Sequence, residues 1–190
     1  MNDRKVQILD AAGIVFSRYG VSKTTMNDIA KTAGLARQTL YNEYPNKEAV
    51  LRAVLRYGAE KTMTAVDARW LDLSDLGDKL DVFFELGPLH WYDAVQSSPE
   101  IADLIDGINS IAQQELIELA SEWVQKFAAM LDQYLADRSF STLDAKELAD
   151  FVYSTSMNAK YNAKDRTVLE DRLKILKMTV LSLISSANIS

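Results

Sequence analysis

Apolar residues recur along this chain at the three- and four-residue spacing that places them on one face of an α-helix. Pro88 is expected to kink or break one of these helices, because proline removes a backbone donor and crowds the preceding turn. The pattern predicts an all-α fold. The expected helices cover 4–19 (one stripe of Ile8, Ala12, Val15 and Tyr19, ended by Gly20), 47–70, 75–96, 110–136, 144–163 and 167–186, with a short helix that begins within Ser97–Glu100, runs through Ile105 and is closed by Gly107.

The stretch 24–44 is predicted to form two short helices joined by a tight turn. Thr25 and Asp28 have the spacing of a capping box, with Asp in place of the usual Glu. Gly34 stands where a helix commonly ends in a left-handed conformation, which only glycine adopts cheaply. The apolar positions of the first short helix share one face: Met26, Ile29, Ala30 and Ala33.

The second short helix carries residues suited to contact with DNA. Burial of Leu40 and Tyr44 turns four polar side chains outward, namely Arg37, Gln38, Tyr41 and Asn42. Arginine pairs with guanine, and glutamine or asparagine pairs with adenine, while tyrosine can contact a thymine methyl or a phosphate. The stretch has the sequence form of a helix-turn-helix, whose second helix enters the major groove. The alternative is a helical hairpin whose outer face is merely soluble.

The start of the next helix has an unusual charge. Pro45 ends the preceding helix and Asn46 is a good N-cap. Lys47 then occupies the first turn, where the helix dipole disfavours a cation by a few tenths of a kcal/mol. A phosphate bound at this helix start would explain the lysine. An exposed lysine that is tolerated at small cost is the alternative.

The charge of the chain is distributed unevenly between its two regions. The 190-residue chain has a net charge of −6, but residues 1–52 carry +3 and residues 53–190 carry −9. The basic charge therefore accompanies the predicted DNA-contacting helices, and the acidic remainder is expected to be repelled by phosphates. The alternative is that the net charge of +3 over this short segment arose by chance.

Composition argues against enzymes and membrane proteins. With one His and no Cys, the commonest catalytic base and nucleophile are nearly absent, and the carboxylates form no paired arrangement. The chain also lacks thiolate zinc ligands and a Gly-rich phosphate loop, so no metal and no cofactor are expected. No apolar run approaches the ~18 residues that span a membrane, and the start of the chain is no signal-peptide core, so a cytoplasmic location is expected.

From Ile8 to Val54 the chain resembles the DNA-binding domain of TetR-type (tetracycline-repressor family) transcriptional regulators. The resemblance implies an all-α homodimer that binds palindromic operator DNA and usually represses transcription. It also implies an amino-terminal helix-turn-helix domain over 1–52 and a helical effector-binding and dimerisation domain over 53–190. The matching elements are Ile8-Leu9-Asp10-Ala11-Ala12 with Phe16 and Gly20, then Thr24-Thr25, Ile29-Ala30, Ala33-Gly34-Leu35, Thr39-Leu40-Tyr41, Tyr44 and Asn46-Lys47-Glu48.

The family roles can be carried onto the matching positions. The resemblance implies that Thr25 and Lys47 hold phosphates at two helix starts and that Tyr41 also contacts the backbone. Arg37 and Gln38 would face bases, with Asn42 beside them on the outward face and Thr39 beside a phosphate.

Two positions depart from the family pattern. Ala36 stands where a capping Ser is frequent, so the second short helix is expected to start less firmly. Glu43 stands where His or another aromatic residue is common. Its carboxylate either accepts from a cytosine amine or points away from DNA, and the sequence leaves both open.

The last predicted helix, 167–186, is apolar on more than one side. One stripe comprises Leu169, Leu173, Leu176, Val180 and Leu183, and other sides carry Val168, Ile175, Met178 and Leu181. Such a helix must be buried on more than one side, so we expect a homodimer through the two C-terminal helices. A central helix inside a monomer is the alternative.

A small-molecule effector site is expected near the Pro88 kink, where a bent helix lined by aromatics could form the wall of an apolar pocket. An equally open interpretation is that these are core aromatics with one satisfied His. The alternative to an effector-released repressor is a helical adaptor or protein-partner regulator, which would not need the outward polar set described above. The effector candidates are His90, Trp91, Tyr92, Asn109, Gln113 and Trp123.

Overall fold

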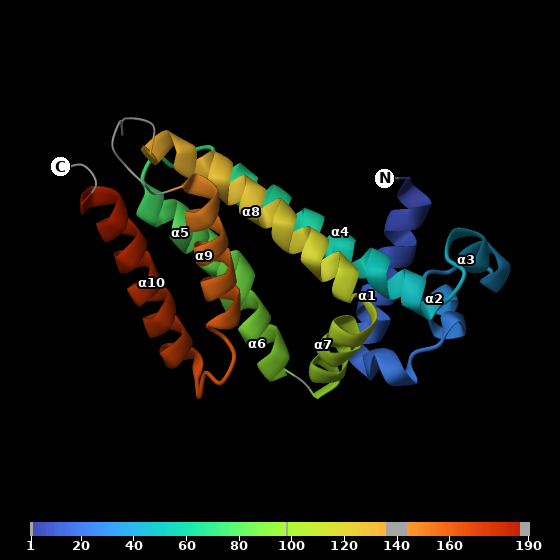
Figure 1. The fold of residues 1–190 in the computed structure, drawn as a ribbon. Helices are drawn as coiled ribbons and strands as arrows, with labels where there is room; N and C mark the ends of the chain where they lie inside the picture. The colour runs from blue at the N-terminus through green and yellow to red at the C-terminus, as the bar shows by residue number, and fades with distance from the viewer. Residues whose placement is uncertain (1, 98, 136–143, 187–190) are drawn as a thin grey trace. The chain divides into compact units, whose positions relative to one another are not determined.

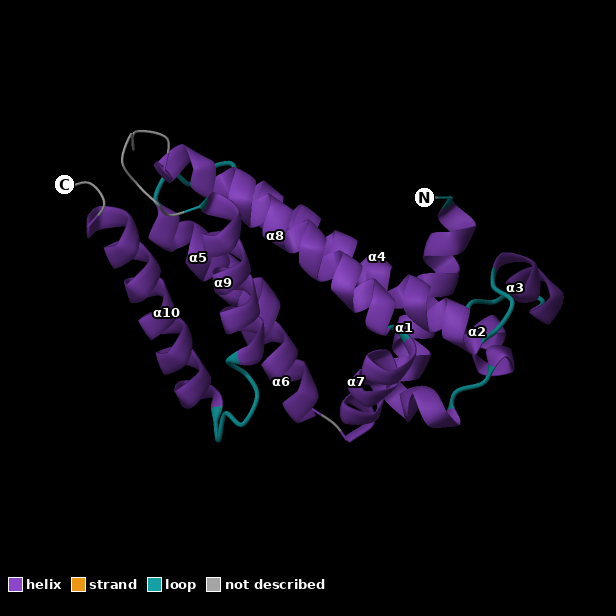
Figure 2. Cartoon of the chain, in the orientation of Figure 1, coloured by secondary structure: helices purple, strands orange, loops and turns teal. Residues whose placement is uncertain are grey.

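The computed structural model describes residues 2–97, 99–135 and 144–186. Within these ranges the chain is helical and contains no strand, which confirms the predicted all-α fold (Figure 1 and Figure 2). The elements are α1 (Asp3–Lys23), α2 (Met26–Thr32), α3 (Arg37–Glu43), α4 (Lys47–Trp70), α5 (Leu76–Phe84), the π-helical turn η1 (Glu85–Leu89), α6 (His90–Ser97), α7 (Pro99–Ile111), α8 (Gln113–Leu135), α9 (Ala145–Asn158) and α10 (Arg166–Ser186).

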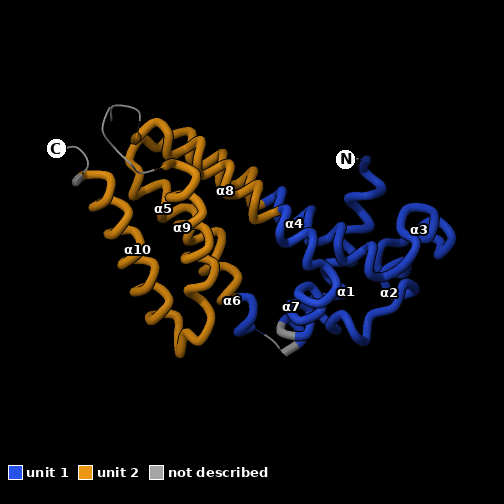
Figure 3. Tube along the Cα trace, in the orientation of Figure 1, with its two compact units in different colours: residues 1–61, 94–118 blue, residues 62–93, 119–190 orange. Residues whose placement is uncertain are grey.

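The helices pack into two compact units (Figure 3). Unit 1 comprises residues 1–61 and 94–118, and unit 2 comprises residues 62–93 and 119–190. Unit 1 therefore includes α7 and the first turns of α8 in addition to the amino-terminal helices. This is a division by packing, and the functional division between residues 52 and 53 stays a prediction.

In unit 1, α7 packs against α1 through a close approach at Gly107. A Cβ atom at this glycine would lie 2.8 Å from Val21 Cγ2, which is closer than real Cβ contacts come. The expectation that Gly107 closes the helix was wrong, because α7 continues to Ile111. The glycine is needed for helix packing and not for helix termination. Its neighbours Leu104 and Ile108 are buried in the core of the unit.

Gly20 breaks the helix where the sequence predicted an end, but α1 continues beyond it to Lys23. The Gly20 φ of 76° lies in the left-handed region, and the chain bends there before the helix resumes. Ile8, Ala12 and Val15 are buried as expected. Tyr19, which was assigned to the same stripe, is 46% exposed because it lies at the bend, and the Arg18 guanidinium lies 5.3 Å from its ring centroid.

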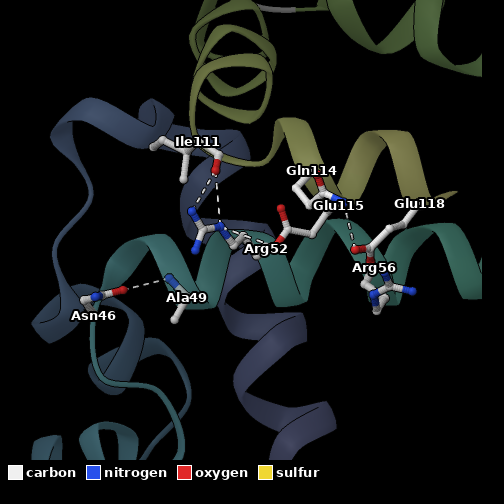
Figure 4. Close-up of polar contacts among 8 residues, drawn as sticks. All are labelled: Asn46, Ala49, Arg52, Arg56, Ile111, Gln114, Glu115 and Glu118. Atoms are coloured by element: carbon white, nitrogen blue, oxygen red, sulfur yellow. Dashed lines mark hydrogen bonds and ion pairs between the residues drawn. The ribbon is translucent and has the colours of Figure 1, made fainter. Parts of the chain in front are cut away.

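Polar contacts join α4 to the end of α7 and the start of α8 within unit 1 (Figure 4). Arg52 donates from Nε and Nη2 to the carbonyl of Ile111, at 3.2 and 3.0 Å, and its Nε lies 3.4 Å from a Glu115 carboxylate oxygen. Arg56 Nη2 pairs with Glu118 at 2.7 Å. Ile111 is the last residue of α7, so Arg52 satisfies a carbonyl that the helix itself leaves unpaired.

The core of unit 2 is built around Phe83 of α5. Its ring lies 4.7 Å from that of Phe127 and 5.1 Å from that of Trp123, both on α8, and 6.2 Å from that of Tyr153 on α9. Edge and tilted contacts of this kind are favourable arrangements of aromatic rings. Leu169, Leu173, Leu176 and Val180 of α10 complete the same core.

The predicted kink at Pro88 appears as the π-helical turn η1. The N–H of His90 reaches back to the carbonyl of Glu85, five residues earlier, across the proline. A wider turn of this kind accommodates a residue that has no N–H donor and that crowds the preceding turn.

One predicted stripe on α10 needs a correction at its end. Ile184, and not Leu183, is buried with Val180, because four residues bring a side chain back to the same helix face. Leu183 is 43% exposed, and Ile175 and Met178 are also exposed. The preceding helix ends at Asn158, earlier than the expected 163, and Arg172 donates to the carbonyls of Ala159 and Tyr161 in the turn that follows.

Candidate nucleic-acid interface

The helix-turn-helix is formed by α2 and α3, with local geometry that the sequence anticipated. The Thr25 hydroxyl accepts from the N–H of Asp28 at 3.3 Å, and the Asp28 carboxylate accepts from the N–H of Thr25 at 3.0 Å, which completes the capping box. The hydroxyl of Thr25 also donates to this carboxylate at 2.6 Å. These bonds from Thr25 hold the pKa of Asp28 below its usual range, so the box is formed with an ionised carboxylate.

The turn between the two helices depends on Gly34. This residue has a φ of 65°, which lies in the left-handed region that the sequence predicted. The N–H of Leu35 donates to the carbonyl of Ala30 at 2.9 Å, so the chain closes tightly after α2. Ala36 provides no side-chain cap for α3, which confirms the departure noted from the sequence.

Leu40 anchors α3 in the core of unit 1 with no exposed surface. The four side chains that the sequence turned outward are all exposed, and we call them the reading face: Arg37, Gln38, Tyr41 and Asn42. Thr39 and Tyr44 are half-buried beside this anchor. Burial and the neighbouring Glu43 raise the pKa of the Tyr44 phenol.

The reading face is internally ordered by two pairs of side chains. Arg37 Nη2 donates to the hydroxyl of Tyr41 at 3.2 Å, and the guanidinium carbon lies 5.3 Å from the centroid of the same ring. Gln38 Nε2 donates to Asn42 Oδ1 at 3.0 Å. In each pair the partner lies one helical turn further along α3.

Glu43 has a partner inside unit 1. A carboxylate oxygen lies 3.9 Å from Lys5 Nζ of α1, and the side chain is 21% exposed. Of the two alternatives left open for this residue, the structure favours the one in which the carboxylate points away from the reading face. Lys5 is itself 46% exposed, so this pair adds little stability.

Lys47 has a structural explanation that sequence reasoning did not find. Its ammonium donates to the carbonyls of Val21, Thr24 and Ser22, at 2.6, 2.9 and 3.4 Å. These carbonyls belong to the end of α1 and the junction to α2, where a cation is favoured. Lys47 is therefore unfavourably placed at the start of α4 but favourably placed against the carbonyls at the end of α1. Asn46 caps α4 as predicted, accepting from the N–H of Ala49 at 2.8 Å.

Asp103 of α7 is a site residue that sequence reasoning missed. Its carboxylate accepts from the N–H and the hydroxyl of Ser22, and these bonds hold its pKa below the usual range. No local pattern marks this residue, because the contact joins positions 81 apart in the sequence.

The six effector candidates are divided between the two units. His90, Trp91, Tyr92 and Trp123 belong to unit 2, and the exposed Asn109 and Gln113 belong to unit 1. Tyr92 and Trp123 are core residues, Trp91 is half-buried and His90 is exposed. A hollow of about 650 Å³ lies instead between α9 and α10 and is lined by none of the six.

Two further findings concern site types that the sequence did not suggest. Among the described residues, no three His, Cys, Asp or Glu side chains are grouped as a metal site would require. The same residues include no helix with both the length and the apolar character needed to cross a membrane.

Comparison with known proteins supports the helix-turn-helix and extends beyond it. Residues 8–54 match the family model described as bacterial regulatory proteins, tetR family. The HTH-type transcriptional repressor KstR2 of Rhodococcus jostii is 24% identical over 159 residues, which are 80% of this chain and 76% of that protein. The uncharacterized HTH-type transcriptional regulator YfiR of Bacillus subtilis is 28% identical over 99 residues, 46% of this chain and about half, 48%, of its own length.

The likeness of fold extends over nearly the whole chain. A solved TetR-family transcriptional regulator from Pectobacterium atrosepticum aligns with a TM-score of 0.72 at 19% identity, covering 95% of this chain and 94% of that one. These relatives are DNA-binding regulators and not enzymes. Since the family's sequence pattern over residues 8–54 coincides with an observed helix-turn-helix, this chain carries a DNA-binding domain of the TetR-family type, and the chain as a whole has a helical fold similar to that of a solved TetR-family regulator.

Proposed function

We propose that this protein is a dimeric transcriptional repressor that binds a palindromic operator and is released from it by a small-molecule effector. The observation that carries the DNA part is the reading face of α3, in which a guanidinium and a carboxamide are exposed above a buried Leu40. The similar protein KstR2 is named a transcriptional repressor, which supports repression over activation. Binding to operator DNA would place its action in the cytoplasm.

The proposed contacts to DNA fall into two groups. Arg37 and Gln38 face base edges, where a guanidinium suits guanine and a carboxamide suits adenine. Thr25, Thr39, Tyr41 and Lys47 contact phosphates, and Asn42 lies beside the bases on the same face. The Tyr41 hydroxyl accepts from Arg37 and keeps its own proton for a phosphate oxygen. These phosphate contacts fix the register of the helix on the duplex.

The proposed dimer forms through α9 and α10, within the carboxy-terminal region 53–190. Phe151 of α9 and Ile175, Met178 and Leu183 of α10 are large apolar side chains that are 43–64% exposed. Ile175 and Phe151 also line the hollow between the two helices. A second copy that covers this surface would bury it, and the two-fold axis would match a palindromic operator whose half-sites lie ~34 Å apart.

The proposed effector acts by binding one spacing of the two DNA-contacting helices better than the other, since equal affinity for both states shifts nothing. His90 and Trp91 are the accessible members of the candidate set in unit 2, and Tyr92 and Trp123 would form the apolar wall. Asn109 and Gln113 are the polar candidates in unit 1. The helical adaptor considered from the sequence is not favoured, because the relatives described above are DNA-binding regulators.

Selection of bound duplexes from random DNA tests the proposal. We expect a palindromic consensus, and we expect Arg37→Ala to lose about 1–3 kcal/mol on that consensus while relaxing preference at one position of each half-site. Equal loss on every sequence would contradict a base-reading role for Arg37. Failure of the purified protein to bind any duplex at low ionic strength would overturn the function itself.

A further inference from the structure

Each residue of α3 proposed to read a base is tied to a second residue one turn later. The bond from Gln38 Nε2 to Asn42 Oδ1 is 3.0 Å long, and the bond from Arg37 Nη2 to the Tyr41 hydroxyl is 3.2 Å long. All four side chains are exposed, so burial does not hold them in place. The two pairs instead restrict the rotamers of long side chains that would otherwise be ordered only on binding.

The polar groups of Gln38 that are not bonded to Asn42 are those needed to bind adenine. A carboxamide has one carbonyl and two N–H donors, and Asn42 accepts one of the donors. The carbonyl and one N–H remain. Adenine presents an N6 donor and an N7 acceptor in the major groove, which these two groups match as a bidentate pair.

The N–H donors of Arg37 that are not bonded to Tyr41 likewise suit guanine. A guanidinium has five N–H donors, of which Tyr41 accepts one. Guanine presents the O6 and N7 acceptors, which a guanidinium fork contacts with two parallel N–H donors. Contact with the Tyr41 ring, 5.3 Å away, further restricts the position of the guanidinium.

We propose that α3 recognises a guanine and an adenine at neighbouring positions of each half-site, and that Asn42 and Tyr41 are positioning residues that hold Gln38 and Arg37 for this readout. Arg37 and Gln38 are consecutive residues in the first turn of α3 and both are exposed, which supports contact with bases that lie near each other. The inference rests on the proposed function, since it names the sequence that the same DNA site takes.

A double-mutant cycle tests the role of Asn42. Wild type, Gln38→Ala, Asn42→Leu and the double variant are each used to select duplexes from random DNA. Affinities are then measured for the wild-type consensus and for the same duplex with the adenine replaced. We expect wild type to prefer the adenine by roughly tenfold, the value of one good bidentate contact. Both single variants should reduce that preference to about twofold or less, and the double variant should lose no more than Gln38→Ala alone.

Several outcomes would overturn the inference. A wild-type consensus without neighbouring G and A, or full adenine preference in Asn42→Leu, contradicts it. A further loss when Asn42→Leu is added to Gln38→Ala would show that Asn42 reads DNA by itself. Tyr41→Phe keeps the ring but removes the acceptor, and it should reduce guanine preference without changing that for adenine.

Two controls separate this test from the proposed function. Gln125→Leu likewise replaces a carboxamide with leucine, at an exposed position of α8 that the proposed DNA and effector contacts do not use, and it should leave the consensus unchanged. Binding to non-specific DNA at low salt is measured for the Gln38 and Asn42 variants, and we expect it to stay within about twofold of wild type because these variants keep the phosphate contacts that supply it. If wild type binds no duplex even there, the proposed function fails. If it binds duplexes but selects no G and A step, only the present inference fails.

Discussion

The Asp103 carboxylate of α7 accepts two hydrogen bonds from Ser22, one from its N–H at 3.2 Å and one from its hydroxyl at 3.3 Å. Ser22 lies at the end of α1, after the break at Gly20, and the carbonyls of this junction with α2 also accept from the Lys47 ammonium of α4. Within unit 1, this junction is therefore held by two helices that are distant in sequence. Because α2 begins at Met26, the junction sets where the helix-turn-helix starts.

We predict that Asp103→Ala lowers the stability of the protein more at pH 7 than at pH 3. The bonds from Ser22 keep the pKa of Asp103 below its ordinary value, so its contribution is present above about pH 3.9 and is lost as pH falls through the lowered pKa. Urea unfolding at the two pH values measures this. The control Asp106→Ala changes an exposed carboxylate on the same helix and should give equal small effects at both. A wild-type advantage as large at pH 3 as at pH 7 would refute the linkage.

For Lys47→Met we predict a loss of about 1–3 kcal/mol in the free energy of unfolding, because three carbonyls lose a charged donor. Chemical denaturation measures it, with the exposed Lys146→Met as a control expected to change stability little. The salt dependence of DNA binding separates the two roles of this residue. A slope that falls by about one supports a phosphate contact, whereas an unchanged slope restricts Lys47 to its internal role.

Gly107→Ala should destabilise the protein by about 1–3 kcal/mol, since the new methyl would lie 2.8 Å from Val21 Cγ2 in a packed interface. Gly13→Ala is the matched control in α1, where a Cβ would meet nothing within 4 Å. That change should stabilise the protein by roughly 0.5–1 kcal/mol through helix propensity. Thermal melting of both variants is the measurement. Adding Val21→Ala should recover part of the loss at Gly107, and failure to do so would remove the steric explanation.

The parts of the site that the sequence predicted correctly depend on short-range geometry. A capping box needs only Thr25 and Asp28, three residues apart, and the turn needs only a glycine at position 34. The outward direction of Arg37 and Gln38 follows from the burial of Leu40 on the same short helix. In each of these, the helical period and a cap decide the result before any tertiary contact forms.

The parts that could not be predicted depend on a distant partner. Gly107 has the spacing of a helix end but is required by Val21, which lies on another helix. Lys47 is unfavourable within α4 and favourable only against the end of α1. Glu43 fits either alternative until Lys5 is placed beside it. The local sequence pattern shows that such a residue is unfavourable or ambiguous at its position, but it does not identify the distant residue whose contact explains it.

Alkaline pH should destabilise unit 2 through Tyr153. Burial raises the pKa of this phenol to about 12, so the folded state keeps its proton in a range where the unfolded chain loses it. The stabilising contribution is present below about pH 10 and is lost as pH rises toward 12, a change of about 2–3 kcal/mol. Denaturant unfolding between pH 8 and 11 should show a flatter decline for Tyr153→Phe than for wild type. The exposed Tyr161→Phe is the control, and an identical decline in all three proteins would contradict the assignment.

The exposed apolar surface of α10 leads to a prediction about assembly. Met178 is 60% exposed and Ile175 is 64% exposed, so neither is explained by the core of its own unit. A glutamate at position 178 would place a charge in the proposed interface, where an unpaired buried carboxylate is strongly unfavourable. We expect Met178→Glu to be monomeric at micromolar concentration by light scattering and to bind a palindromic duplex at least tenfold more weakly than wild type. Leu71→Glu makes a similar change at a side chain that is 85% exposed outside this surface and should remain dimeric. Dimeric Met178→Glu, or monomeric wild type, would show that α10 does not form the interface.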